Sequence, residues 1–141
     1  MTVFVDTAVI MYAGGAEHPL RQPCRDLLDA VVEDRLQAET SAEVIQEILN
    51  RFVAIGRRAE GARMAAAALD LFSPVLPITD SVMRLTRELV PKKRSLSARD
   101  LVHVATCVVG GIGRIVSPER AFDEVDNIER LSPQEAFELS K

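Results

Sequence analysis

The sequence predicts an α/β fold in which helices cover both faces of a mostly parallel sheet. Short β-branched or aromatic runs, at residues 3–5, 114–116 and 128–131, alternate with longer amphipathic segments. The first run stops at Asp6, as buried parallel strands often stop at a polar residue. Strands that alternate with helices favour a parallel sheet, because each connecting helix returns across one of its faces.

The expected helices follow from three- and four-residue apolar spacing and from the residues at their ends. One helix opens at Pro23, and a second opens at Thr40, where Glu43 would complete a capping box. An alanine-rich helix is expected over about 58–72. The segment SPVLPI after it is expected to form a short strand that its prolines limit.

Three further helices are expected in the second half of the chain. Asp80 can cap a helix that runs to about Val90. Ser97 begins the next helix, and the glycines of GGIG end it before strand 114–116. The terminal helix is expected to begin with a capping box at Ser132.

The composition is that of an ordinary globular protein. Hydrophobic residues make up 48% and charged residues 27% of 141 residues, which argues against disorder and suits one domain over 1–141. Five Phe, one Tyr and no Trp imply an aliphatic core, and base-stacking platforms of the kind that single-strand binders use are not expected. Cys24 and Cys107 lack metal-site spacing and are expected to be reduced packing residues.

The sequence contains no recognisable targeting or membrane-spanning segment. Its N-terminus lacks a basic region and carries Asp6 within the apolar run, which argues against a signal peptide. No apolar stretch approaches the ~20 residues that a membrane-spanning helix needs. A cytoplasmic protein without membrane association is therefore expected.

The formal charge of −4 disfavours general attraction to nucleic acid, because phosphate binding normally uses a basic surface. The basic residues are grouped, however, around residues 57–63 and 92–99. The first group is interpreted as a solvated helix end. Acidic residues gathered in one metal pocket would leave the outer surface less negative than the total charge suggests.

Three carboxylates are candidates for chemistry. Asp6 ends an apolar strand, where an ionised group is costly unless it meets a cation or several donors. Glu47 lies beside the apolar stripe of its helix, and Asp100 follows Ser97 by three residues. Each has a structural alternative: a helix N-cap for Asp6, an i,i+4 pair with Arg51 for Glu47, and a capping box for Asp100.

Two neighbouring positions add to this set. Ser117 and Glu119 follow strand 114–116 directly, at the carboxyl edge where functional groups gather in such sheets. His103, one turn after Asp100, could be a general base or a supporting donor, but a packed neutral histidine is the favoured interpretation.

Converging carboxylates repel one another and would be partly protonated at neutral pH unless a divalent metal ion compensates them. Ligand sets made only of oxygen favour Mg²⁺ or Mn²⁺ over zinc. Such ions lower the pKa of a bound water, orient it toward a phosphodiester and stabilise the leaving oxygen. The acidic residues therefore favour metal-dependent phosphodiester hydrolysis.

At these residues the sequence resembles the PIN-domain family, and within it the VapC toxins of bacterial toxin–antitoxin pairs. FVDTAVIMY, SAEVIQEILNRF and SLSARDLVHVATC are similar to the first three motifs of the family. IVSPERAFDEVDNIERLSP is similar to its closing strand, acidic turn and final short strand. The similarity covers essentially the whole chain, and four motifs in this order are more specific than any one alone.

The resemblance implies a three-layer α/β/α sandwich with a central parallel sheet and a metal-dependent endoribonuclease activity. It implies that Asp6, Glu47 and Asp100, together with a fourth acidic residue, are catalytic and bind Mg²⁺ or Mn²⁺. It also implies an RNA substrate, a homodimer and a VapB-type antitoxin that neutralises the enzyme.

Two departures from the family pattern matter. Ala8 stands where the family usually has Asn or Ser, so a supporting contact to the site is expected to be missing. Glu119 replaces the usual Asp of the fourth motif, with Asp123 and Asp126 nearby. Glu119 is the favoured fourth residue, and Asp123 is the alternative metal ligand.

The sequence leaves two other functions open. A phosphatase of the haloacid-dehalogenase type also places an Asp at the end of its first strand, but Ala8 occupies the position of its second Asp. A binding module that has lost its metal and acts only through a partner is the non-catalytic alternative.

Overall fold

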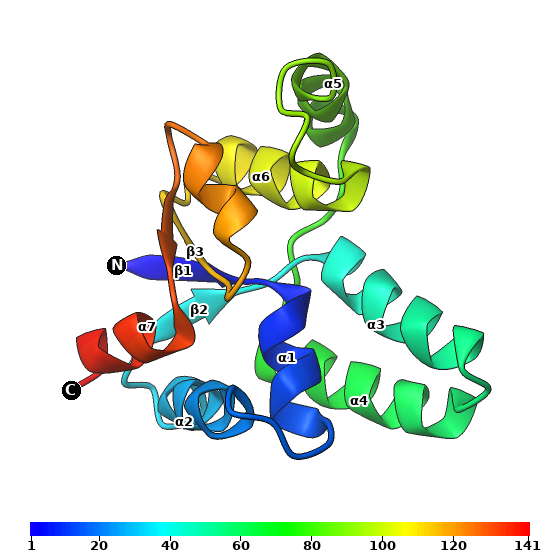
Figure 1. Cartoon of the computed structure of the whole chain (residues 1–141), viewed down its shortest axis with the longest axis vertical. Helices are drawn as coiled ribbons and strands as arrows, with labels where there is room; N and C mark the ends of the chain where they lie inside the picture. The colour runs from blue at the N-terminus through cyan, green and yellow to red at the C-terminus, as the bar shows by residue number, and fades with distance from the viewer.

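The computed structural model describes all 141 residues and contains a four-stranded parallel sheet between layers of helices (Figure 1). The spatial order of the strands is β2-β1-β3-β4, and every neighbouring pair is parallel. The strands are β1 (Thr2–Val5), β2 (Gln37–Glu39), β3 (Arg114–Val116) and β4 (Glu129–Leu131). The predicted α/β class with a parallel sheet is confirmed.

Seven α-helices and one 3₁₀ turn surround the sheet. Helices α5 and α6 pack together on one side of it, and α1, α2 and α7 lie on the other, while α3 and α4 form a projecting hairpin (Figure 1). Their bounds are α1 (Thr7–Gly14), α2 (Arg21–Val32), α3 (Ala42–Ala54), α4 (Arg58–Leu71), α5 (Asp80–Leu89), α6 (Ala98–Gly110), η1 (Arg120–Glu124) and α7 (Pro133–Leu139). None of the helices combines the length and apolar composition that a membrane-spanning segment requires.

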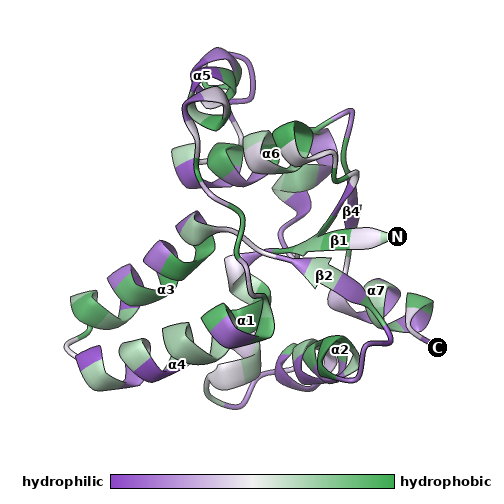
Figure 2. Ribbon diagram, turned by 180° about the vertical axis from the view of Figure 1, so that it is seen from behind, coloured by the Kyte–Doolittle hydropathy of each residue, from purple (hydrophilic) through white to green (hydrophobic).

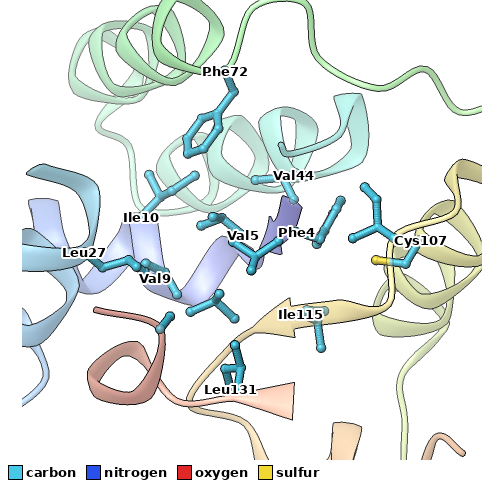
Figure 3. Close-up of a cluster of buried hydrophobic side chains, with 14 of the residues drawn as sticks. Phe4, Val5, Val9, Ile10, Leu27, Val44, Phe72, Cys107, Ile115 and Leu131 are labelled. Atoms are coloured by element: carbon cyan, nitrogen blue, oxygen red, sulfur yellow. The ribbon is translucent and has the colours of Figure 1, made fainter. Parts of the chain in front are cut away.

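The core forms on both faces of β1, because successive strand residues point in opposite directions. Phe4 lies toward Cys107 of α6, whereas Val5 lies near Val9 of α1 and Leu27 of α2 (Figure 3). In Figure 2, β1 is hydrophobic along most of its length and the helices mix hydrophobic with hydrophilic residues, as expected of helices with one buried face. Both cysteines are free and buried, as predicted.

The start predicted at Thr40, for the helix that is α3 in the structure, is wrong by one residue. Ser41, not Thr40, caps α3, and its hydroxyl accepts a hydrogen bond from the Val44 amide at 3.3 Å. The Thr40 hydroxyl instead donates to the Val5 carbonyl at 2.8 Å, which ties the end of β2 to the end of β1. The Thr40 side chain therefore joins two strands and does not cap the helix, and no capping box with Glu43 forms.

Other predicted ends also shift. The segment SPVLPI forms no strand; only Leu76 makes an isolated bridge, to Ser41. Its prolines lack the amide donors that a strand needs. Thr79 rather than Asp80 caps α5, and α2 begins at Arg21 rather than Pro23.

The terminal capping box is complete. The Ser132 hydroxyl accepts from the Glu135 amide at 3.1 Å, and the Glu135 carboxylate accepts from the Ser132 amide at 3.0 Å. This local signal predicted the start of α7 correctly, because both partners lie within four residues of each other.

We predict that Ile115→Ala lowers the free energy of unfolding by about 2–5 kcal/mol, because Ile115 of β3 is fully buried and truncation leaves a cavity. Ile55→Ala is the matched control: Ile55 is 62% exposed, and its truncation should change stability by no more than ~0.5 kcal/mol. Urea unfolding of both variants measures the difference. Equal losses would contradict the assignment of Ile115 to the central core.

Candidate metal centre

Asp6 and Ser117 lie at the point where the sheet reverses its winding. The chain passes from β1 to β2 on one side, whereas β3 pairs with β1 on the other. Groups at the carboxyl ends of these strands border the crevice where open α/β sheets bind ligands. The Asp6 amide donates to the Val116 carbonyl at 3.1 Å, so it extends the pairing of β1 with β3 by one bond.

The carboxylate of Asp6 is 3% exposed and accepts two short hydrogen bonds. The Thr7 amide donates to its Oδ1 at 2.8 Å, and the Ser117 hydroxyl donates to its Oδ2 at 2.7 Å. The first bond makes Asp6 the N-cap of α1. The structural alternative for Asp6 is therefore realised, and the same carboxylate also lies close to Asp100 and His103.

Glu47 approaches Asp6 from α3 and is buried, with 8% of its surface exposed. Its Oε1 accepts from the Thr7 hydroxyl at 2.9 Å and lies 3.2 Å from Nε2 of His103. Its Oε2 lies 3.7 Å from the Arg51 guanidinium, so the predicted i,i+4 pair is also present. Thr7 thus connects Asp6 to Glu47 through adjacent backbone and side-chain donors.

Helix α6 brings Asp100 and His103 to the same place. The Ser97 hydroxyl caps α6 by accepting from the Asp100 amide at 3.1 Å. One ligand atom each from Asp6, Asp100 and His103 lie within 4.8 Å of one another. The donor set fits a divalent cation, because hard carboxylate oxygens converge and Nε2 of His103 already faces Glu47.

Glu119 and Asp123, the two candidates for the fourth position, lie in different surroundings. Glu119 is exposed, but it lines a cavity together with Glu47, Arg51 and Asp100. Asp123, on η1, is paired with Arg130, with carboxylate oxygens 2.8 and 3.3 Å from the guanidinium. Of the two, only Glu119 borders the acidic cavity.

Burial and neighbouring charges shift the pKa values of Asp6, Glu47 and His103 by different routes. Burial raises the pKa of Asp6, against the opposing effects of His103 and the Ser117 hydroxyl. Burial also acts to raise the pKa of Glu47, but hydrogen bonds from His103 and Thr7 outweigh it and hold that pKa below its usual value. Burial disfavours the His103 imidazolium, but Glu47 and Asp6 outweigh this and raise its pKa. The imidazole of His103 thus lies beside both carboxylates, and their charges favour its protonation.

The charges of the buried carboxylates also affect Glu119, at the edge of the acidic cavity. Partial desolvation, together with the charges of Asp100 and Asp6, raises the pKa of Glu119. A hydrogen bond from Arg130 instead lowers the pKa of Asp123. Glu119 thus responds to the carboxylate cluster, whereas Asp123 responds to a cation outside it.

Two features of this site differ from what the sequence predicted. Thr7 was not singled out, although a hydroxyl next to Asp6 was a usable signal. His103 was interpreted as a neutral packing residue; it is fully buried, but its Nε2 faces Glu47 and lies 3.7 Å from Asp6. Its position one turn after Asp100 was the available signal, because both residues then lie on one face of α6.

Comparison with known proteins accounts for the arrangement. A family model described as the PIN domain matches residues 3–128. Ribonuclease VapC23 of Mycobacterium tuberculosis (strain ATCC 25618 / H37Rv) is 38% identical over 80% of this chain and 89% of its own length. The chain belongs to the PIN-domain family, among the VapC ribonucleases. Ribonuclease VapC13 of the same organism is 35% identical to this PIN domain, over 92% of this chain and 99% of the relative.

Solved structures share the fold of this PIN domain at lower identity. VapBC2 from Rickettsia felis, bound to a DNA fragment from its promoter, superposes with a TM-score of 0.72 at 13% identity. FitAcB from Neisseria gonorrhoeae superposes with a TM-score of 0.72 at 17% identity. Both matches cover 94% of this chain and 98% of the other, so the PIN-like sandwich predicted from the sequence is confirmed.

We predict that Asp6→Asn leaves the melting temperature of the metal-free protein unchanged or higher at neutral pH. Because the folded-state pKa of Asp6 is raised, its ionised form costs stability above that pKa, and the cost disappears as the pH falls toward the unfolded value of about 4. The neutral Asn lacks this cost, so the advantage of the variant should shrink on acidification.

Calorimetry over a pH series without divalent ions measures this advantage. Asp70→Asn, at an exposed position of α4, controls for the simple loss of one negative charge. If Asp6→Asn melts well below the wild type at neutral pH, the hydrogen bonds from Thr7 and Ser117 matter more than the repulsion.

Proposed function

We propose that this PIN domain is a Mg²⁺- or Mn²⁺-dependent endoribonuclease toxin, which cuts RNA in the cytoplasm with a metal-activated water. The observation that carries the proposal is the convergence of Asp6, Asp100 and His103 at the carboxyl edge of the sheet, with Glu47 held beside them by His103 and Thr7. Its similarity to proteins named ribonucleases supports RNA as the substrate class.

Each acidic residue takes a distinct role in this proposal. Asp6 and Asp100 would hold the ion. The buried hydrogen bonds from Thr7 and Ser117 fix the two carboxylate oxygens of Asp6. Glu47, oriented by Thr7 and His103, acts as a further ligand or as the acceptor for the proton of the attacking water. When bound, the ion supplies a water of lowered pKa and stabilises the leaving oxygen.

Glu119 completes the proposed site at the rim. Its side chain is one methylene longer than the Asp that the resemblance leads one to expect, which displaces the carboxylate by ~1.5 Å. Mg²⁺ readily keeps several waters, so we assign Glu119 a contact through a bound water. Arg51 and Arg99, which line the same cavity, supply positive charge for the phosphates of the substrate.

The acidic site is tested by a graded series of variants. We predict that Asp100→Asn abolishes metal-dependent RNA cleavage, whereas Glu119→Gln reduces it by the ~10- to 100-fold typical of outer metal contacts. Asp123→Asn is the matched control and should retain near wild-type activity, since its carboxylate is paired with Arg130. Cleavage rates across Mg²⁺ and Mn²⁺ titrations compare the three variants.

Two results would change this assignment. A larger loss for Asp123→Asn than for Glu119→Gln would transfer the fourth position to Asp123. Full cleavage by a correctly folded Asp100→Asn protein would refute the metal-dependent mechanism and leave the domain as a non-catalytic binding module.

We also propose that a VapB-type antitoxin neutralises the enzyme and that the active form is a homodimer. VapBC2 from Rickettsia felis and VapBC-5 from Mycobacterium tuberculosis, which share this fold, belong to toxin–antitoxin systems, and this supports a protein partner. A largely apolar cavity between α1, α2 and α4 offers the groove, with Ile10, Leu28, Met64, Ala67 and Leu71 in its lining. An Arg of the antitoxin is suited to enter the acidic site, because its guanidinium pairs bidentately with carboxylates.

We predict that Ala67→Arg weakens inhibition by the antitoxin while RNA cleavage by the free enzyme is retained. Ala67 is exposed and lines the apolar cavity, so a charged side chain there blocks the groove without disturbing the core. Ala66→Arg, at the neighbouring exposed position outside the cavity, is the matched control. Equal inhibition of both variants in a cleavage assay with added antitoxin would contradict this groove as its site.

A further inference from the structure

A second cavity adjoins the acidic one and is not used by the proposed metal chemistry. Arg51 and Glu119 line both cavities, so the two form a continuous surface. The far wall of the second cavity consists of one face of α1, where Ala8, Met11 and Tyr12 recur at helical spacing. A substrate chain whose phosphate lies at the carboxylates would pass Arg51 and Glu119 on its way into this cavity.

An aromatic pair stands in this second cavity. The rings of Tyr12 and His18 lie 4.6 Å apart between centroids, with an interplanar angle of 34°. Nδ1 of His18 accepts a hydrogen bond from the Leu20 amide at 3.0 Å, which fixes the histidine ring and leaves its Nε2 free to donate. Tyr12 is half-buried and His18 exposed, so the pair is held in place yet open to a ligand.

Helix α1 connects the aromatic pair to the acidic site. Tyr12 follows Thr7 by five residues along α1, a rise of about 7.5 Å. Thr7 donates to both Asp6 and Glu47. The cavity of the aromatic pair adjoins the acidic cavity, and Arg51 lines both.

We propose that this cavity is a nucleobase subsite, in which the base next to the cleaved phosphate stacks on Tyr12 and His18. The inference rests on the proposed ribonuclease function and extends it to substrate selection. Bases stack well on aromatic rings, and Arg51 is placed to contact the adjoining phosphate. Nε2 of His18 and the carboxylate of Glu17, which also line the cavity, offer a donor and an acceptor to the edge of the base.

Ala8 contributes to this subsite by its small size. The resemblance to the family predicted a polar Asn or Ser here, with a contact toward the metal site. In this chain Ala8 instead lines the second cavity, one turn before Tyr12. A larger side chain at this position would take up space in the cavity that Ala8 leaves open.

A nucleobase fits this cavity better than a segment of the antitoxin does. The cavity mixes aromatic, cationic and anionic side chains and is continuous with the acidic site. The groove between α1, α2 and α4, in contrast, is mostly apolar and suits a protein segment. The cavity contains a single aromatic pair, Tyr12 and His18, so the subsite accommodates one base rather than a long stacked strand.

The first test observes Tyr12 directly. It is the only tyrosine in a chain without tryptophan, so tyrosine labelled with ¹³C gives NMR ring signals from this position alone. Short single-stranded RNA of random sequence is added with Ca²⁺ in place of Mg²⁺ or Mn²⁺. Because a stacked base shields the ring beneath it, we expect the signals of the Tyr12 ring protons to move upfield until the site is saturated. Double-stranded RNA of the same composition should not produce this shift. Tyr12 signals that stay in place with the single-stranded RNA overturn the proposal.

The second test measures sequence preference at the cut. Sequencing the products from a random RNA pool should reveal a base preference next to the cleaved bond, and Tyr12→Ala should weaken that preference and slow cleavage by roughly 5- to 100-fold. Tyr12→Phe should keep both, because the ring remains. Phe137→Ala removes a half-buried aromatic from α7 and is the matched control for a general loss of packing.

The outcomes separate this proposal from the function on which it rests. Cleavage by Tyr12→Ala with unchanged preference and rate overturns the subsite but leaves the ribonuclease intact. Upfield shifts of Tyr12 without any cleavage of RNA support the subsite and refute the ribonuclease. If Tyr12→Ala changes only the inhibition by the antitoxin, the cavity is a protein contact and the proposal fails.

Discussion

The burial of an ionisable carboxyl group at the end of β1 is the constraint on which the site depends. Asp6 lies between the two central strands, where an uncompensated charge would be costly. Its oxygens accept from the first amide of α1 and from the hydroxyl that follows β3. The direction of α1, the pairing of β1 with β3 and the approach of α6 are all fixed around this group.

The burial and mutual repulsion of these carboxylates lower the stability of the folded chain. Burial and neighbouring carboxylates raise the pKa of Asp6, and His103 compensates only in part, since it also serves Glu47. A protein selected for stability alone would place apolar residues here. In the proposed function a divalent ion would relieve this repulsion, so the same charges that oppose one another would favour the binding of metal.

An acidic ribonuclease must still attract a polyanion. The total charge of −4 gives no general attraction to RNA, but Arg51 and Arg99 line the acidic cavity itself. Arg51 also borders the cavity of Tyr12 and His18, which links metal chemistry to the recognition of a base. These two arginines place positive charge where the phosphates of the substrate would pass.

Local sequence determined the alternation of strands and helices, the caps at Ser97 and Ser132, and the short list of acidic residues, because each depends on neighbours within a few positions. The resemblance to the PIN family placed Asp6, Glu47 and Asp100 in one site, which spacing alone could not do. Only the tertiary structure decided that Thr7 and His103 orient Glu47, and that Arg130 draws Asp123 away while Glu119 stays at the cavity. The polar strand β2 and the hydrogen bond of Thr40 to Val5 likewise exist only because β1 offers a pairing edge. These interactions join residues far apart in the chain, and topology rather than local preference brings such residues together.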